Sequence, residues 1–307
     1  MNLKLLLIKL LCLTIINVSL FSGCTSNNGN ERPTVLATTS ILGDILRNIL
    51  PEQITVDQLM GPGVDPHLYK ASQGDVQSLS RADVIVYNGL HLEGKMSEIL
   101  ERLSRTKEVI AFADPLPASL LRSLDSGGVV DPHIWFDLEL SVRCVEQLTA
   151  DLSKIFPDRG SVITESGKAY IQKLHETHKW CVSQINQLPA DDRILITSHD
   201  AFGYFGDAYN FRVRGLQGIS TLSESGLKDV TNMVNFIIDH KVKAVFVENS
   251  VPQKALRSVI EGCRRKGHEV NIVGELFSDA LGEERTPEGT YVGMIRYNIG
   301  TIINALQ

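Results

Sequence analysis

A short histidine-containing motif occurs twice in this sequence. Val64-Asp65-Pro66-His67 returns as Val130-Asp131-Pro132-His133. Core packing does not explain such a polar repeat, whereas a histidine fixed behind a proline in a polar loop is well placed to bind a ligand. A third histidine, His199, follows the apolar run at 194–196. We therefore expect His67, His133 and His199 to converge on one metal ion.

Asp279 offers a fourth donor, although a Ser-Asp pair in a loop is also a common helix cap. All four residues follow predicted strands, and ligands of open α/β sheets bind beyond the carboxyl ends of the strands. Three imidazoles and one carboxylate form a closed ligand set for Zn²⁺ at about 2.0–2.2 Å. Mn²⁺ also accepts nitrogen and oxygen ligands, particularly if Asp279 binds through both oxygens. Asp65 and Asp131 are candidates for orienting the imidazoles.

The other histidines are interpreted as surface or hydrogen-bonding residues rather than ligands. They are His91, His175, His178, His240 and His268. Nearby aromatic residues are expected to exclude water from the metal site. They are Trp135, Phe136, Phe202 and Tyr204.

Strands and helices are predicted to alternate along the first half of the chain, which indicates a parallel α/β sheet. The predicted strands are 34–39, 54–59, 83–87 and 108–112, and the predicted helices are 40–50, 73–81, 95–105 and 137–155. Residues 159–188 lack proline and carry one apolar stripe, which predicts a helix of about 40 Å.

The alternation resumes after Pro189. The predicted strands are 193–197, 211–219, 244–248 and 270–273, and the predicted helices are 226–240, 253–266 and 287–305. We expect two α/β lobes, at 34–157 and 189–307, each with a mainly parallel sheet flanked by helices. One long rigid helix, within 158–188, would join them, and the metal site would lie in the interlobe cleft.

The N-terminus has the features of an export signal that precedes the fold. A short basic region is followed by the mainly apolar run 10–21 and by Ser22-Gly23-Cys24. This ending resembles a bacterial lipobox, which predicts a signal peptide at 1–23, a lipidated Cys24 and a tether at 24–33. The alternative is an ordinary signal peptide that is cleaved nearby, with Cys24 incidental.

Composition limits the possible partners. The 307-residue chain is 43% hydrophobic, as in an ordinary soluble globular protein, and its formal net charge is −6. No basic patch or arginine-rich tract occurs, so we expect no nucleic-acid partner. Beyond the predicted signal and Cys24, three cysteines remain without a CxxC spacing, and they are interpreted as buried, unreactive thiols.

The residues together resemble the metal-binding lipoproteins of bacterial zinc/manganese ABC importers, the cluster A-I solute-binding proteins. The resemblance rests on the two Asp-Pro-His motifs, Ser-His199-Asp-Ala-Phe-Gly-Tyr-Phe, Gly218-Ile-Ser-Thr-Leu-Ser-Glu-Ser-Gly, Val245-Phe-Val-Glu-Asn and Ser278-Asp279-Ala-Leu-Gly. It implies metal ligation by His67, His133, His199 and Asp279. It also implies a monomer that is lipid-anchored on the outer side of the bacterial cell membrane and delivers metal to the permease and ATPase subunits of an importer.

The resemblance leaves the metal open between Zn²⁺ and Mn²⁺. The set of three histidines and one aspartate is most similar to that of the treponemal-type members. Manganese-selective members usually have glutamate where His199 stands, and strongly zinc-selective members often carry a histidine-rich loop where this chain has 115–128. Ligand chemistry favours tighter binding of zinc.

Two other functions are alternatives. A zinc hydrolase requires an open coordination position and a nearby base, for which Glu248 and Glu224 are the candidates. The sequence has no His-Glu-x-x-His motif, and Asp279 as a fourth ligand would close the site. A surface adhesin is the other alternative, but no adhesive repeat occurs.

Overall fold

The computed structural model describes residues 32–123 and 128–307. The predicted signal peptide, Cys24 and most of the predicted tether therefore lie outside the described residues. None of the helices in the described part of the chain has both the length and the apolar character that a membrane span requires.

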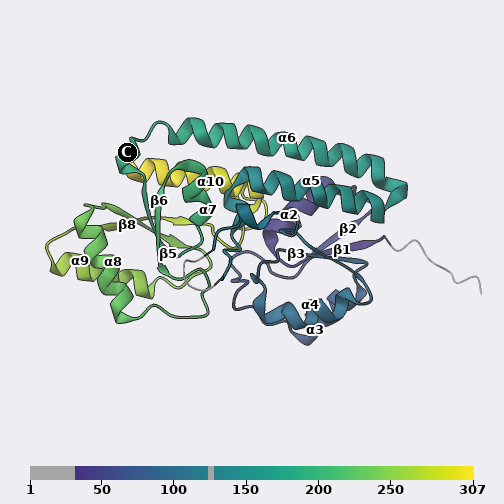
Figure 1. Ribbon diagram of the computed structural model, residues 1–307, viewed down its shortest axis with the longest axis horizontal. Helices are drawn as coiled ribbons and strands as arrows, with labels where there is room; N and C mark the ends of the chain where they lie inside the picture. Colours follow the sequence, from purple (N-terminus) through teal and green to yellow (C-terminus); the bar gives the residue numbers. More distant parts are fainter. Residues whose placement is uncertain (1–31, 124–127) are drawn as a thin grey trace, which may run out of the picture. The chain divides into compact units, whose positions relative to one another are not determined.

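The first lobe contains a four-stranded parallel sheet with the strand order β2-β1-β3-β4. Strands β1, β2 and β3 are labelled in Figure 1. Its strands are β1 Thr34–Ala37, β2 Thr55–Gln58, β3 Val84–Tyr87 and β4 Glu108–Ala111. The connecting helices are α2 Ser40–Ile49, α3 Gln73–Arg81 and α4 Ser97–Ser104. The two central strands are apolar and largely buried on both faces, as expected for a parallel sheet covered by helices.

Side-chain caps define where several of these helices begin. The Thr39 hydroxyl accepts a hydrogen bond from the Leu42 amide and thereby caps α2. Ser72 and Asp75 form a reciprocal capping box at α3. Strand–helix alternation was thus predicted correctly, with boundaries that differ by one or two residues.

Two long helices follow in the chain: α5 Leu138–Ile155, capped by Asp137, and α6 Gly160–Ile185, which leads into the second lobe. The 26 residues of α6 span about 39 Å, as predicted. This helix is packed along its length rather than free-standing, because it contacts α5, α10 and α2 (Figure 1). Its rigidity therefore comes from tertiary packing as well as from helical hydrogen bonds.

The second lobe contains two parallel strand pairs, β5–β6 and β7–β8, with β5 close to β7. The strands are β5 Ile194–His199, β6 Arg212–Gln217, β7 Ala244–Glu248 and β8 Asn271–Leu276. The helices are α7 Gly203–Tyr209, α8 Leu227–Asp239, α9 Lys254–Arg265 and α10 Tyr291–Leu306. The two-lobe α/β prediction is confirmed in its class, with two corrections: His199 ends strand β5 instead of following it, and α7 was not predicted.

Short 3₁₀ helices complete the secondary structure. They are η1 Gly94–Met96, η2 Ala118–Leu120, η3 Ile134–Phe136, η4 Pro157–Arg159, η5 Ala190–Asp192 and η6 Pro287–Gly289.

The largest hydrophobic core extends from the first lobe through α5 and α6 to α10. The chain therefore does not divide into two halves with wholly separate cores, although a smaller core lies within the second lobe. Tyr291 at the start of α10 is fully buried, and its hydroxyl donates to the Trp135 carbonyl at 2.5 Å. The last helix is thereby fixed to the loop that carries His133.

Close packing of α5 on α6 is tested by two glycine substitutions. A Cβ on Gly167 would lie 2.4 Å from Thr149 Cγ2, whereas a Cβ on Gly300 would meet nothing within 4 Å. We expect Gly300→Ala to stabilise the protein by about 1 kcal/mol through helix propensity. Gly167→Ala should instead destabilise it by about 1–2 kcal/mol, because steric overlap outweighs that gain. Denaturant unfolding measures both, and equal stabilisation by the two variants would contradict the packing.

Candidate metal centre

Four side chains from separate parts of the sequence meet at one buried point. His67 lies in the loop after β2, His133 directly precedes η3, His199 ends β5, and Asp279 lies in the loop after β8. One ligand atom from each lies within 4.8 Å of the others. The arrangement follows from topology, because the carboxyl ends of parallel strands bring their following loops to one edge.

Three of the separations between donor atoms are compatible with a single cation site. His67 Nε2 lies 3.3 Å from His133 Nε2, and His133 Nε2 lies 3.3 Å from Asp279 Oδ1. His199 Nε2 lies 3.4 Å from Asp279 Oδ2. A tetrahedron with metal–ligand bonds of about 2.1 Å has edges of about 3.4 Å. Because different oxygens of Asp279 face different imidazoles, this carboxylate is also oriented for binding through both oxygens.

The four residues are almost fully shielded from solvent. His67 is 2% exposed, Asp279 1%, and the other two 0%. His199 Nε2 and Asp279 Oδ1 have no hydrogen-bond partner. Buried polar atoms without partners are unfavourable, and a bound cation would satisfy both. This set of residues can therefore hold a divalent metal ion.

Two buried carboxylates orient two of the imidazoles from behind. Asp131 Oδ1 lies 2.8 Å from His133 Nδ1 and also accepts from the His133 amide at 3.0 Å. Glu248 contacts His199 at the corresponding two positions. Its Oε2 lies 2.5 Å from His199 Nδ1, and its Oε1 accepts from the His199 amide at 2.9 Å. Each contact directs Nε2 of its ring toward the centre.

The other predicted orienting residue, Asp65, acts on the backbone instead. Its Oδ1 accepts from the His67 amide at 2.8 Å and the Leu68 amide at 3.4 Å, while its Oδ2 accepts from the Thr221 hydroxyl at 2.6 Å. The orienting role of Glu248 was not predicted. A glutamate at the end of a buried strand has the same local sequence pattern whether it orients a histidine or acts as a general base. Glu224, the other candidate base, is exposed.

The carboxylates change the protonation of the imidazoles when no metal is bound. Burial alone would lower the pKa of His133, but hydrogen bonds to Asp131 and Asp279 outweigh it and raise this pKa to about 9. Burial of His199 is likewise outweighed by Glu248 and Asp279, which raise its pKa well above the usual value. Metal-free protein therefore carries protons at these two rings near neutral pH.

The pKa values of the other two residues, His67 and Asp279, are lowered. Burial lowers the pKa of His67 to about 4, despite attraction by Asp279. Burial would raise the pKa of Asp279, but His199 and His133 hold it well below its ordinary value. The centre thus keeps one neutral imidazole and one carboxylate ready for a cation.

One of the aromatic residues packs directly against a candidate ligand. The Trp135 ring lies 5.2 Å from the His133 ring, and its Nε1 donates to the Ser278 carbonyl at 2.9 Å, next to Asp279. Phe136 stacks on Phe202 at 4.2 Å. These contacts join residues of both lobes next to the candidate centre.

The other histidines have different partners. His175 contacts Glu139, His178 contacts Tyr209, and His240 and His268 contact backbone carbonyls, while His91 is exposed. Within residues 32–123 and 128–307, only the set of His67, His133, His199 and Asp279 brings three or more metal-binding side chains together.

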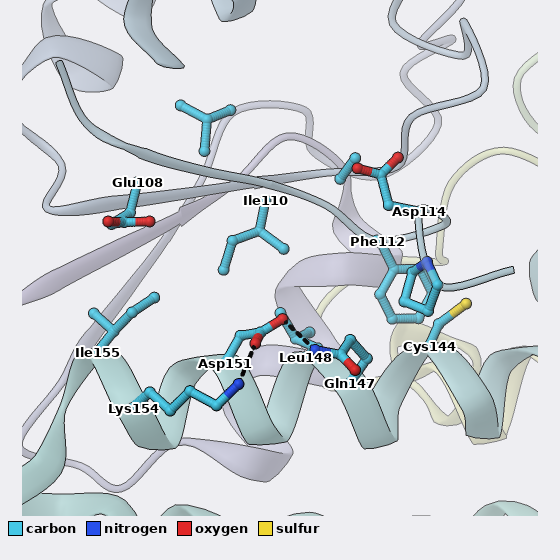
Figure 2. A pocket seen from close by; sticks show the side chains of 13 residues that line it. Glu108, Ile110, Phe112, Asp114, Cys144, Gln147, Leu148, Asp151, Lys154 and Ile155 are labelled. Carbon is cyan, nitrogen blue, oxygen red and sulfur yellow. Dashed lines mark hydrogen bonds and ion pairs between the residues drawn. The ribbon is translucent and has the colours of Figure 1, made fainter. Parts of the chain in front are cut away.

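A separate pocket of about 630 Å³ lies between β4 and α5 (Figure 2). Its lining includes apolar Ile110 and Leu148, and Asp151 accepts hydrogen bonds from Gln147 and Lys154. None of the four metal-facing residues lines it. The candidate centre is therefore a buried cluster rather than an open pocket.

Comparison with known proteins agrees with this geometry. Residues 35–305 match the family described as "ZnuA: Zinc-uptake complex component A periplasmic". The manganese-binding lipoprotein MntA of Bacillus subtilis is 44% identical over 290 residues, which cover 93% of this chain and 95% of the relative. The zinc-binding protein TroA of Treponema pallidum is 41% identical over 302 residues, which cover 96% of this chain and 98% of the relative.

The fold agrees as well. The solved structure of the periplasmic zinc-binding protein TroA from Treponema pallidum superposes with a TM-score of 0.88 and 43% identity, covering 90% of this chain and 99% of that one. The chain therefore belongs to the ZnuA family.

Proposed function

We propose that this protein captures one Zn²⁺ or Mn²⁺ ion on His67, His133, His199 and Asp279 and delivers it to an ABC importer. The observation that carries the proposal is the convergence of four buried donor residues, with ligand atoms within 4.8 Å of one another and three separations of 3.3–3.4 Å. The names of two relatives, zinc-binding for one and manganese-binding for the other, support the same class of cargo.

The donor set favours tighter binding of zinc without excluding manganese. Three imidazole nitrogens suit Zn²⁺, and Zn²⁺ exceeds Mn²⁺ in affinity for such ligands. Binding through both oxygens of Asp279 would raise the coordination number toward that preferred by manganese. Competition between the two ions at fixed pH ranks them directly.

We further propose the cellular setting expected from the sequence. Residues 1–23 direct export, Cys24 carries the lipid, and residues 24–33 tether the two lobes, at 34–157 and 189–307, to the outer side of the membrane. The protein acts as a monomer that meets the permease, which works with its ATPase. Mass spectrometry of the membrane-extracted protein, with and without Cys24→Ala, tests the anchor.

The hydrolase alternative is disfavoured by the placement of its candidate bases. Both carboxylate oxygens of Glu248 contact His199, and Glu224 is exposed. A donor set of four protein residues also leaves a tetrahedral zinc ion no position for a reactive water. The adhesin alternative has no supporting feature in the described residues.

Replacing one ligand should abolish tight binding. We expect the mature protein to retain about one zinc ion per chain in equilibrium dialysis, and His133→Ala to lower the affinity by more than about 100-fold. His175→Ala, which changes a half-exposed histidine, should bind as the unmodified protein does. Unchanged affinity in His133→Ala, with folding verified by circular dichroism, would exclude this site.

Binding should weaken in acid, because zinc must displace protons from the imidazoles. The pKa of His133 is raised to about 9 without metal, so one proton leaves this ring on binding below that pH. Apparent affinity should fall about tenfold per pH unit for each proton released. Calorimetry in two buffers of different ionisation enthalpy counts these protons. Absence of proton release at pH 7 would contradict the assignment of His133 and His199.

The stability of the metal-free protein should decrease as the pH rises, whereas zinc affinity should increase. A pKa raised in the folded state contributes stability that is complete below the unfolded value of about 6.5 and is lost as the pH rises through about 9. We therefore expect the thermal midpoint of metal-free protein to fall between pH 7 and pH 9, and the zinc-induced increase in that midpoint to grow. A metal-free midpoint that rises over this range would overturn the assignment.

A further inference from the structure

Two segments of the first lobe, around Arg122 and Asp131, lie side by side and contact α7 of the second lobe, close to His133. The Asp131 amide donates to the Arg122 carbonyl at 2.9 Å. The Tyr204 hydroxyl from α7 accepts from the Arg122 amide at 3.0 Å and donates to the Asp131 carbonyl at 3.1 Å. One phenol therefore holds both segments.

The Arg122 guanidinium lies between two carboxylates. Its Nη1 pairs with Asp207 on α7, and its Nε lies 3.6 Å from Asp131 Oδ2. The other oxygen of Asp131 contacts the ring and the amide of His133. Asp131 thus contacts the His133 imidazole through one oxygen and the Arg122 guanidinium through the other.

Gly203 makes room for this arrangement. A Cβ at this position would lie 2.5 Å from Arg122 Nε and 2.7 Å from Asp131 Oδ2. Gly203 has no positive φ, so the space above it, rather than backbone conformation, explains the glycine. The absence of a side chain at Gly203, the first residue of α7, therefore lets the Arg122 guanidinium approach Asp131.

The charges explain why an arginine belongs here. Asp131 is 2% exposed, and a carboxylate at such burial needs a compensating charge, which the guanidinium 3.6 Å away supplies. A planar guanidinium can contact two carboxylates at once, which the single ammonium of lysine does poorly.

We propose that Arg122 is a positioning residue for His133: it pairs with Oδ2 of Asp131, the oxygen that does not contact His133, and thereby fixes the imidazole at the metal. The inference rests on the proposed function, since it assumes a metal bound by His133. It assigns to Arg122 an effect on metal retention, although this side chain lies outside the ligand set.

The test measures zinc release into a chelator by stopped flow and the visible absorption of the Co²⁺-loaded protein. Arg122→Met should release zinc about tenfold faster and alter the Co²⁺ bands, at the lower end of the 10–100-fold cost of losing an outer partner. Gly203→Ala keeps the charge but displaces the guanidinium from Asp131, so it should reproduce both changes. Arg122→Lys should restore only part of the retention.

Two controls separate positioning from lobe attachment. Asp207 is 62% exposed and does not touch Asp131, so Asp207→Asn should change zinc release by no more than a few-fold and leave the Co²⁺ bands unchanged. Arg143→Met removes an exposed arginine of α5 and should have no effect. Thermal unfolding of each metal-free variant verifies folding, and if Arg122→Met does not fold, Gly203→Ala and Arg122→Lys decide.

The outcomes distinguish the inference from the function on which it rests. Wild-type release rates and bands in Arg122→Met and Gly203→Ala would overturn the inference and leave the proposed function intact. Equal acceleration in Asp207→Asn and Arg122→Met, with unchanged bands in both, would also overturn it, because Arg122 would then act only in joining the lobes. Failure of the unmodified protein to take up Zn²⁺ or Co²⁺ would overturn both.

Discussion

The contact between a buried carboxylate and the far nitrogen of an imidazole is the interaction on which the metal centre depends. Asp131 holds His133 in this way, and Glu248 holds His199. Each carboxylate fixes the ring so that Nε2 faces the centre, and raises the basicity of that nitrogen. Such pairs are costly to bury unless their charge is compensated, by protons in the metal-free protein and by a cation in the loaded one.

The fold supplies the rigid support that these pairs require. The largest core continues from the first lobe through α5 and α6 to α10, so the lobes share much of their packing. Trp135 reaches from the first lobe to the Ser278 carbonyl, and Tyr291 reaches from α10 to the Trp135 carbonyl. Closely packed interiors resist gradual deformation. We therefore expect metal capture and release to involve small local movements rather than a large hinge closure.

Much of this arrangement was predictable from the sequence because it follows from local rules. Strand–helix alternation predicts two parallel α/β lobes, and the repeated Asp-Pro-His motif distinguishes His67 and His133 from ordinary surface histidines. Asp279 could be proposed only from its place after a strand. Topology, rather than any local pattern, brings it within 3.4 Å of two imidazoles.

Other parts depend on contacts between distant residues and leave no local pattern. Glu248 reaches His199 because β7 lies beside β5. Asp65 contacts only the backbone of His67, whereas Asp131 also contacts the ring of His133, although both follow the same motif. Helix α7 was missed because its seven residues are rich in glycine and aromatic residues, which have modest helix propensity. Packing against the first lobe stabilises it instead.

X-ray absorption at the zinc edge of the loaded protein tests the central claim most directly, because it reports the identity and distance of the donor atoms. The account predicts three imidazole ligands and one carboxylate, with zinc–ligand distances of about 2.0–2.2 Å and no sulfur. A shell made mainly of water oxygens, or one containing sulfur or fewer than three imidazoles, would contradict it.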